Sequence, residues 1–385
     1  MRFSLRFLLE TIFTAGTVGS LFYYVLSFAG LVSFLRVKRR NSKPATFPGI
    51  SILKPLKGVD PEVWDSFRSH CEQQYKTFEL IFGVSDANDP VCDVVRRLQT
   101  EYSSIPIKLI VCDRVLGANI KVSNLAQMLP HATHDVLLVN DSDIRVTPNY
   151  LREIGAPLAD PGVGLVTCLY RGAAAKTLGS CLESLSIATD FVPGVLSARL
   201  LEGGLHFGLG STLLFRRDDL TAIGGFESFI DYLADDYELG RRIAAIGKRV
   251  ELSEVVVDTF LPAYSFGEFI NHQLRWWRTI RDARRWGYMG LMFTFGLPWA
   301  IATVLIADGA AWAWELFATT LAARLIIGMG TAIGVLHEGG TMRTFILLPL
   351  RDLITPVLWA AGLVSNRIHW RGEEFTLRDG RLERA

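Results

Sequence analysis

Residues 135–146, DVLLVNDSDIRV, decide the fold because an apolar run is followed at once by paired carboxylates. The four residues 136–139 are all apolar, which is typical of a short buried strand. Asp141 and Asp143 come directly after them, separated only by Ser142. A buried strand does not normally end in paired negative charge, so this position predicts a site that meets something positive.

Short strands and helices alternate on both sides of this segment. We predict strands at 50–54, 78–84, 107–111 and 136–139, and helices at 62–74, 91–102 and 122–129. This alternation predicts an α/β domain with a mainly parallel sheet over about residues 44–270. In open α/β sheets, ligands bind beyond the carboxyl ends of the strands. The paired carboxylates therefore occupy the expected place for a binding site.

Asp141 and Asp143 are candidate metal ligands. Residues two apart on an extended backbone point the same way, so both side chains could converge on one cation. Hard divalent ions such as Mg²⁺ or Mn²⁺ prefer oxygen ligands. The alternative is that one Asp caps the turn while the other is solvated, and the spacing alone leaves both open.

Other candidate site residues lie at comparable positions. Asp86 follows the strand in LIFGVSDANDP, and Lys121 and Asn124 lie in GANIKVSNL. The chain has no glycine-rich phosphate loop after a strand, so basic side chains and a metal would hold any diphosphate. Asp235 and Asp236 open a predicted helix, where acids serve either as caps or, as a functional Asp would, as a general base.

The two ends of the chain are apolar enough for membrane helices. Residues 11–35 carry no charge, and the basic cluster at 36–43 follows them. This asymmetry predicts that the next domain is cytoplasmic. Further spans are predicted at 287–307 and 310–336. The last apolar block, 345–364, contains Arg351 and Asp352, so we expect it to lie in the interface or re-enter. The arginine-rich tail, 366–385, favours a cytosolic end.

Charge and cysteine content exclude several classes of protein. The 385-residue chain has a formal net charge of +1, which indicates no nucleic-acid partner. Its five cysteines are scattered without a C-x-x-C pair, which argues against a disulfide framework or a zinc site. Residues 271–287 carry arginines interleaved with tryptophans just before an apolar block, a pattern typical of an interfacial helix.

Taken in order, these motifs resemble the membrane-embedded glycosyltransferases of the GT-A fold, and among them the ceramide glucosyltransferase family. The resemblance rests on VSDANDP, NDSDIRV, ADDYELG and HQLRW, and it extends from about residue 50 to 382. It implies a GT-A nucleotide-sugar-binding domain flanked by transmembrane helices. The expected segments are 1–43 (first membrane helix and basic flank), 44–270 (catalytic domain), 271–287 (interfacial helix), 288–365 (C-terminal membrane helices) and 366–385 (cytosolic tail).

The resemblance also implies roles for the candidate residues. Asp86 would contact the nucleotide of the UDP-sugar, and Asp141 and Asp143 would hold the Mg²⁺ or Mn²⁺ ion and the sugar diphosphate. Lys121 and Asn124 stay candidates for binding the diphosphate because of their position in the sequence. Asp236 would be the catalytic base, and Arg275 and Trp276 would complete the catalytic set. The last motif is usually Q/R-x-x-R-W, and His272 stands here where Gln or Arg is expected.

The expected reaction is an inverting transfer of a hexose, with glucose expected, to a hydroxyl of a membrane lipid such as ceramide. The alternatives are hexosyl or N-acetylglucosaminyl transfer to a hopanoid polyol, as in bacterial hopanoid-associated glycosyltransferases, a processive polysaccharide synthase, and an inactive membrane scaffold. The expected location is a bacterial inner membrane with the catalytic domain facing the cytosol.

Overall fold

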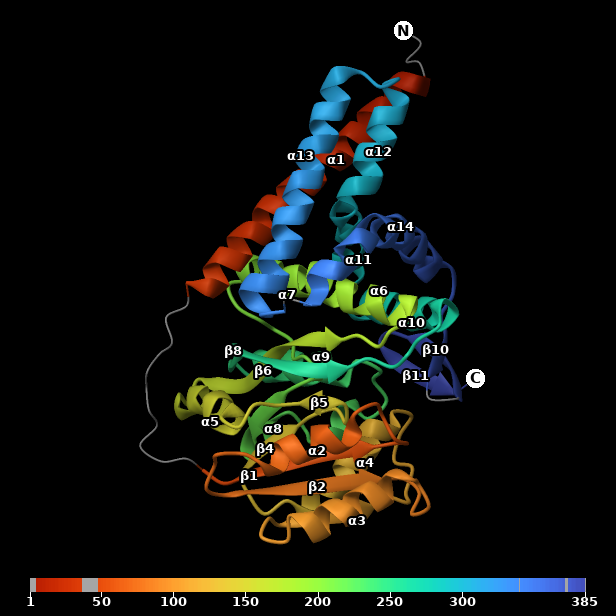
Figure 1. The fold of residues 1–385 in the computed structure, drawn as a ribbon. Helices are drawn as coiled ribbons and strands as arrows, with labels where there is room; N and C mark the ends of the chain where they lie inside the picture. Colours follow the sequence, from red (N-terminus) through yellow and green to blue (C-terminus); the bar gives the residue numbers. More distant parts are fainter. Residues whose placement is uncertain (1–4, 37–47, 339, 371–372, 385) are drawn as a thin grey trace. The chain divides into compact units, whose positions relative to one another are not determined.

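The computed structural model describes residues 5–36, 48–338, 340–370 and 373–384, and it divides into two compact units (Figure 1). The membrane-helix unit comprises Met1–Lys38, Ala174–Leu201 and Ala263–Asn366. The sheet unit comprises Arg39–Ala173, Glu202–Pro262 and Arg367–Ala385. This division differs from the expected consecutive segments in two places: residues 174–201 group with the membrane helices, and the tail groups with the sheet. Residues 38–43 of the predicted basic flank lie outside the described residues.

The sheet unit is built on an eight-stranded mixed sheet of order β3-β2-β1-β4-β7-β6-β8-β5. Strands β3, β2, β1 and β4 are mutually parallel, whereas β7 pairs antiparallel with both β4 and β6. The predicted parallel strands are thus confirmed, and the strands added after them make the sheet mixed. The bounds are β1 Ile50–Leu56, β2 Phe78–Val84, β3 Ile107–Val111, β4 Val136–Val139, β5 Ile144–Arg145, β6 Val163–Ala173, β7 Leu213–Arg216 and β8 Arg249–Phe260.

Helices connect these strands, as the alternating pattern predicts. The helices of the sheet unit are α2 Val63–Cys71, α3 Val91–Glu101, α4 Ile120–Met128, α5 Tyr150–Gly155, α8 Arg217–Ala222 and α9 Asp235–Ala245, with short 3-10 turns η1 Leu129–His131, η2 Ala156–Ala159 and η4 Phe226–Phe229. A second, three-stranded antiparallel sheet follows at the C-terminus, made of β9 Arg367–Trp370, β10 Glu373–Arg378 and β11 Arg381–Arg384.

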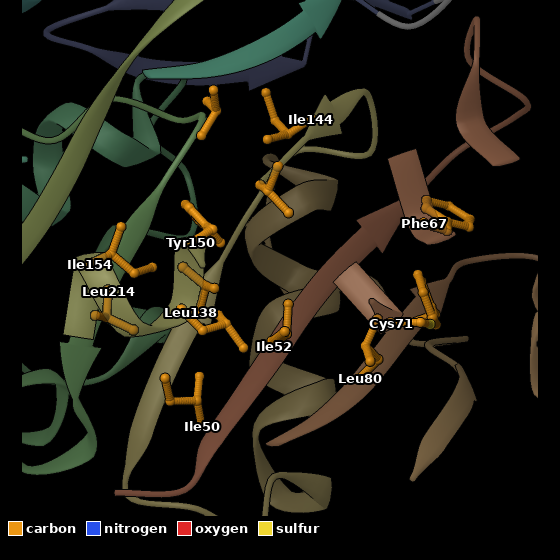
Figure 2. Close-up of a cluster of buried hydrophobic side chains, with 14 of the residues drawn as sticks. Ile50, Ile52, Phe67, Cys71, Leu80, Leu138, Ile144, Tyr150, Ile154 and Leu214 are labelled. Atoms are coloured by element: carbon orange, nitrogen blue, oxygen red, sulfur yellow. The ribbon is translucent and has the colours of Figure 1, made fainter. Parts of the chain in front are cut away.

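The main core of the sheet unit lies between the strands and the helices that cover them (Figure 2). Ile52 and Leu138 come from neighbouring parallel strands, and both are completely buried. Phe67 on α2 packs on Phe82 of β2, with ring centroids 4.7 Å apart. Each such side chain contributes about 1.5–3 kcal/mol on full burial. The strands that carry the candidate carboxylates are therefore rigidly held at their buried ends.

The membrane-helix unit contains the apolar helices. Helices α1, α12 and α13 pack together, and α14 packs on α10 (Figure 1). The bounds are α1 Leu5–Leu35, α6 Leu178–Ser186, η3 Ile187–Phe191, α7 Val192–Leu201, α10 Phe266–Ala283, α11 Arg285–Gly290, η5 Leu291–Thr294, α12 Gly296–Ile306, α13 Ala311–Met329, η6 Gly330–Val335, η7 Gly340–Leu347 and α14 Leu348–Val364, with η3 and η6 π-helical.

Three helices in the described part of the chain are long and apolar enough to cross a membrane: Leu5–Leu35, Ala311–Val335 and Arg343–Val364. The span predicted at 287–307 is not one straight helix, because Arg285–Thr294 and Gly296–Ile306 are bent by 55°. Phe295 at the bend has a non-helical backbone, with φ −85° and ψ 49°. Pro298 has no N–H to bond back across that turn, so a helix begins anew here.

Three of the charges that interrupt the predicted spans, Arg324, Arg351 and Asp352, are paired inside the membrane-helix unit. Arg324 on α13 contacts Asp352 on α14 through Nε at 2.9 Å and Nη2 at 2.7 Å. Arg351 reaches Asp190 of η3, with Nη1 3.0 Å from Oδ2. Buried charges persist in apolar surroundings only when they are paired in this way. The re-entrant path of α14 stays a prediction.

Candidate active site

The carboxylates predicted from NDSDIRV lie in the turn that follows β4. Asn140 begins this turn and is fully buried, donating through Nδ2 to the Tyr150 hydroxyl at 2.9 Å and to the Ser211 carbonyl at 2.6 Å. These bonds fix the backbone from which Asp141 and Asp143 project. The turn is therefore set by its buried first residue rather than by either Asp acting as a cap.

Lys121 links two of the predicted acidic motifs. Its ammonium lies 2.8 Å from Oδ1 of Asp141 and 3.0 Å from Oδ2 of Asp235, and only 10% of the side chain is exposed. Although burial favours the neutral amine, the charges of Asp141 and Asp235 raise the pKa of Lys121. A permanently charged ammonium thus lies between the two acidic motifs, as a site for an anionic ligand requires.

Asp236 points into the same site. Its Oδ2 accepts a 2.8 Å hydrogen bond from the backbone nitrogen of Gly210. A β-carbon placed on Gly210 would lie 3.0 Å from Oδ2 of Asp141 and 3.4 Å from Oδ2 of Asp236, so Gly210 lies between the two carboxylates. Burial, with the neighbouring charge of Asp235, raises the pKa of Asp236 to about 6.

The acidic pair bonds the start of helix α9 and also has partners outside the helix. Helix α9 begins at Asp235, and the residue before it, Ala234, offers no side chain to the free N–H groups. Asp235 is engaged by Lys121, and Asp236 accepts from Gly210 and from the backbone nitrogen of Tyr237. Asp236 thus bonds one free N–H group of the first turn, and both acids gain from the positive end of the helix. The contacts with Lys121 and Gly210 show that both acids also face the residues around Asp141.

Asp143 has a different environment from Asp141. It accepts a hydrogen bond from the Thr259 hydroxyl on β8. Burial and the nearby charge of Asp141 raise the pKa of Asp143 to about 6. Two carboxylates thus compete for charge in one turn, an arrangement that a bound cation relieves.

Lys54 is a site residue that sequence reasoning missed. It belongs to the apolar strand β1, is fully buried, and donates from Nζ to the backbone carbonyl of Asp141 at 3.0 Å. Burial lowers the pKa of Lys54 to about 7, while the charges of Asp143 and Asp141 oppose this shift. The signal in the sequence was a single lysine within the apolar segment ISILKPL.

Asp86 and Asn124 lie at the carboxyl end of β2. Asp86 is exposed, and its Oδ1 accepts from the backbone nitrogen of Asn88 at 2.9 Å. Asn124 on α4 is buried, and its Oδ1 accepts from the Ser85 hydroxyl at 3.1 Å. Both therefore lie at the predicted edge of the sheet. They have no direct contact with the Asp141–Lys121–Asp235 group among the interactions described.

Arg275 and Trp276 belong to α10 of the membrane-helix unit. Trp276 packs on Phe191 and on the ring of His272, with centroids 6.0 Å and 5.4 Å apart. His272 places Nδ1 3.3 Å from Oε1 of the buried Glu183. The histidine that replaces the usual Gln or Arg is thus anchored by an acid and an aromatic neighbour.

The residues present fit a divalent cation bound together with a diphosphate. Among the described residues, no group of three or more His, Cys, Asp or Glu side chains has the geometry to hold a metal ion. A magnesium-type ion needs only one or two carboxylates when substrate phosphates and water complete its shell. Asp141 and Asp143, whose charges interact within the turn after β4, would supply that number.

Comparison with known proteins identifies the family. A model of glycosyl transferase family 21 matches residues 13–383. Ceramide glucosyltransferase 1 of Caenorhabditis elegans is 22% identical over 375 residues, covering 94% of this chain and 78% of the relative. Ceramide glucosyltransferase 3 of the same nematode is 24% identical over 264 residues, covering 67% of this chain and 57% of that relative. The match to this second protein thus spans less than two thirds of its length.

A solved structure shows the same fold. The mannosyltransferase PcManGT of Pyrobaculum calidifontis, in complex with GDP-Man and Mn²⁺, superimposes with a TM-score of 0.56 at 20% identity, covering 92% of this chain and 96% of that one. The similarity confirms the predicted GT-A architecture with membrane helices. Together with the family match, it leads to one conclusion: the chain belongs to glycosyl transferase family 21, the ceramide glucosyltransferase family that its motifs predict.

Proposed function

We propose that the protein transfers a hexose, with glucose expected, from a UDP-sugar to a hydroxyl of a membrane lipid, with ceramide expected. Family membership and the ceramide glucosyltransferases among its relatives support this proposal. The observation that carries it is the position of Asp236, whose carboxylate lies across Gly210 from Asp141. A base thus stands beside the residues that would bind the sugar diphosphate.

Asp236 is the proposed general base. A carboxylate whose pKa is raised to about 6 is still ionised at neutral pH and is a better proton acceptor than an ordinary aspartate. It takes the proton of the lipid hydroxyl as the oxygen attacks the anomeric carbon. The bond from that carbon to the UDP oxygen breaks on the opposite face, so the configuration inverts.

The departing UDP carries the negative charge that develops in the reaction. Lys121 stays protonated because two carboxylates raise its pKa, so it is suited to stabilise an anion without giving up its proton. Mn²⁺ is present in the solved structure of PcManGT. A Mg²⁺ or Mn²⁺ ion held by Asp141 and Asp143 would supply further neutralisation of the diphosphate. Asp86 and Asn124 are proposed to contact the nucleotide.

A lipid acceptor accounts for the apolar helices of the same chain. The lipid tails stay in the bilayer, while the hydroxyl is presented to a water-soluble donor. Arg275 and Trp276, on the basic and aromatic helix α10, are proposed to belong to the catalytic residues, as the family motif implies. The uncharged run 11–35 and the basic residues after it support a membrane protein with the sheet unit on the cytosolic side. A bacterial inner membrane is the proposed location.

The test is a transfer assay on the full-length protein in detergent. Radiolabelled UDP-glucose, UDP-galactose and UDP-N-acetylglucosamine are each supplied with a short-chain ceramide or a hopanoid polyol, and the products are identified by mass spectrometry. We expect a glucosylated ceramide carrying a single sugar. A sugar polymer would favour the processive synthase, and a glycosylated hopanoid would replace ceramide as the acceptor.

The base assignment is tested with Asp236→Asn. We expect loss of transfer with UDP binding retained, because the substitution removes the proton acceptor while keeping the size of the side chain. Asp218→Asn is the matched control, since Asp218 is an exposed acid in the first turn of another helix, α8. Wild-type turnover by the Asp236→Asn protein would show that another group is the base. Absence of transfer and of UDP binding in the wild type would revive the scaffold alternative.

A further inference from the structure

The C-terminal strands form a small core with the segment that precedes the acidic pair. Leu233, three residues before Asp236, is buried together with Ile368, Phe375, Leu377 and Leu382 of the three-stranded sheet. The sequence predicted only a cytosolic tail here. The tail is instead a folded part of the sheet unit, and its apolar face covers the chain just before α9.

Backbone hydrogen bonds fix the register of this contact. The nitrogen of Leu382 donates to the carbonyl of Asp231 at 2.7 Å, and the nitrogen of Leu233 donates to the carbonyl of Gly380 at 3.0 Å. Asp379 and Gly380 form the turn between β10 and β11, with φ of 49° and 78°. An Asp-Gly pair suits two positive φ values in a tight hairpin. The hairpin turn at Gly380 thus contacts the loop 230–233 that precedes α9.

Side chains add a second contact between the same segments. The guanidinium carbon of Arg381 lies 5.2 Å from the ring centroid of Tyr232, within the range of a cation–π interaction. A β-carbon on Gly380 would approach the Tyr232 ring to 3.3 Å, so the hairpin turn packs closely on this ring. Tyr232 is therefore held on the tail side by both an arginine and a turn.

The opposite side of the same loop holds the start of α4. The Asp231 carboxylate accepts from the backbone nitrogen of Ala118 at 2.8 Å. Asn119 donates from Nδ2 to the carbonyl of Tyr232 at 2.7 Å, and its own Oδ1 caps α4. Lys121, which bridges Asp141 and Asp235, is two residues further along α4. Residues 230–233 thus contact both the β9–β11 sheet and the start of α4, which carries Lys121, and they lead directly into the acidic pair of α9.

We propose that the C-terminal β9–β11 sheet positions the catalytic groups, and that Arg381 and Tyr232 are positioning residues for Asp236. The inference rests on the proposed function, in which Asp236 is the base. Neither Arg381 nor Tyr232 touches substrate in this proposal. They fix the loop from which α9 begins, and small displacements of catalytic groups lower turnover steeply even when binding persists.

The test compares Arg381→Met, which removes the charge over Tyr232, with Arg381→Lys, which keeps it. Arg384→Met is the matched control, because Arg384 is also exposed and lies on the same strand. With radiolabelled UDP-glucose and short-chain ceramide, or the donor and lipid that the wild type accepts, we expect Arg381→Met to lower kcat about 10-fold. The KM for the donor and the Tm should stay near those of the wild type, and Arg381→Lys should retain most of the kcat.

Hydrogen exchange tests the same coupling without an activity assay. The amide of Leu233 bonds to Gly380, and the amide of Tyr237 bonds to the Asp236 carboxylate, so both report on the loop. We expect both amides to exchange faster in Arg381→Met and to be unchanged in Arg384→Met. The inference is overturned if exchange at both amides is unchanged, or if a transferring enzyme keeps its kcat in Arg381→Met. If the wild type transfers no sugar but both amides still exchange faster in Arg381→Met, the proposed function is overturned and the structural coupling between the tail sheet and the loop stands.

Discussion

The backbone nitrogen of Gly210 donates to the carboxylate of Asp236 at 2.8 Å, and the side of Gly210 on which a β-carbon would stand faces the carboxylates of both Asp236 and Asp141. A methyl group at Gly210 would enter this space, 3.0 Å from Asp141 and 3.4 Å from Asp236. Contacts of 3.0–3.4 Å are tighter than those that a β-carbon normally makes, so at least one carboxylate would have to move. The glycine is therefore an element of the site rather than of the fold alone.

Gly210→Ala should lower kcat about 10- to 100-fold because it displaces a catalytic carboxylate by a fraction of an ångström. The measurement is steady-state transfer with UDP binding followed in parallel. Gly194→Ala is the control, since no heavy atom lies within 4 Å of its β-carbon position and the residue belongs to a helix. Equal activity of the two variants would show that Gly210 has no part in positioning the acids.

The pH dependence of transfer should follow the ionisation of Asp236. A base must be deprotonated to accept the lipid proton, and the pKa of Asp236 is raised to about 6 by burial and by Asp235. Below about pH 6, kcat should therefore fall about tenfold for each pH unit, and it should level off above pH 7. The profile is measured with saturating donor and lipid. A flat profile between pH 5 and 7, a range that extends about one unit to either side of the Asp236 pKa, would contradict Asp236 as the base.

The same group should show a trade-off between stability and activity. Because the pKa of Asp236 is higher in the folded protein than the ordinary aspartate value of 3.8, the folded state binds more protons between these two values. Its ionisation therefore costs stability as the pH rises through this window, and the cost is fully present at pH 7. Asp236→Asn should raise the Tm by about 2–4 °C while lowering kcat about 100- to 10,000-fold. Thermal unfolding at pH 7 and at pH 4 checks this, since the gain should vanish at the lower value.

Much of this site could be predicted from local sequence patterns. The run 136–139 and the acids after it give a strand followed by a turn, and the structure places Asp141 at the end of β4. The parallel strands β1 to β4 follow from their own apolar patterns, and the five cysteines are free, as their scattered spacing indicates. Each of these features depends on residues that are close together in the chain.

The remaining features depend on contacts between distant segments. Nothing in the local sequence distinguishes Lys54 from any other lysine. Its role depends on the pairing of β1 with β4, because this pairing brings Nζ of Lys54 to the carbonyl of Asp141, 87 residues away. The Gly210 amide carries no signal in the sequence, because every residue except proline has one. The tail sheet was missed because its hairpin pattern predicts neither its partner loop nor the acidic pair beside it. Pairing of this kind is decided by tertiary packing.

The buried Glu79 should be a determinant of stability in the sheet unit. It accepts hydrogen bonds from the Ser51 hydroxyl at 2.6 Å, from Lys108 at 2.8 Å, and from the backbone and hydroxyl of Thr133 at 2.6 and 2.8 Å. Burial alone would raise the pKa of Glu79, but these hydrogen-bond partners lower it to about 2. The ionised Glu79 therefore stabilises the folded state above the ordinary glutamate pKa of 4.5, and this stabilisation is lost as the pH falls toward 2.

Glu79→Gln should destabilise the protein by about 2–3 kcal/mol at pH 7, because Lys108 loses its charged partner and a donor replaces an acceptor. The difference from the wild type should shrink below about pH 4 as the native carboxylate becomes protonated. Thermal unfolding in detergent measures both effects. Asp93→Asn is the control, because Asp93 is 83% exposed and its pairing with Arg96 is a surface ion pair of little energetic weight. If the Glu79→Gln protein is as stable as the control, the hydrogen bonds to Glu79 do not contribute measurably to the stability of the fold.

Asp352→Asn should destabilise the membrane-helix unit more than any loss of a surface charge. Asp352 binds Arg324 through both of its oxygens, and the side chains are 7% and 3% exposed. Asp352→Asn leaves Arg324 to share Asp190 with Arg351, so one of the two buried guanidinium charges loses its own counterion. Removing one member of a buried charge network in this way costs about 3–5 kcal/mol. Asp308→Asn is the matched control, since Asp308 also pairs with an arginine, Arg6, but is 73% exposed. We expect a clear fall in Tm and in detergent-resistant yield for Asp352→Asn, and neither change for Asp308→Asn. Equal Tm values for both variants would mean that α13 and α14 are held together by apolar packing rather than by this ion pair.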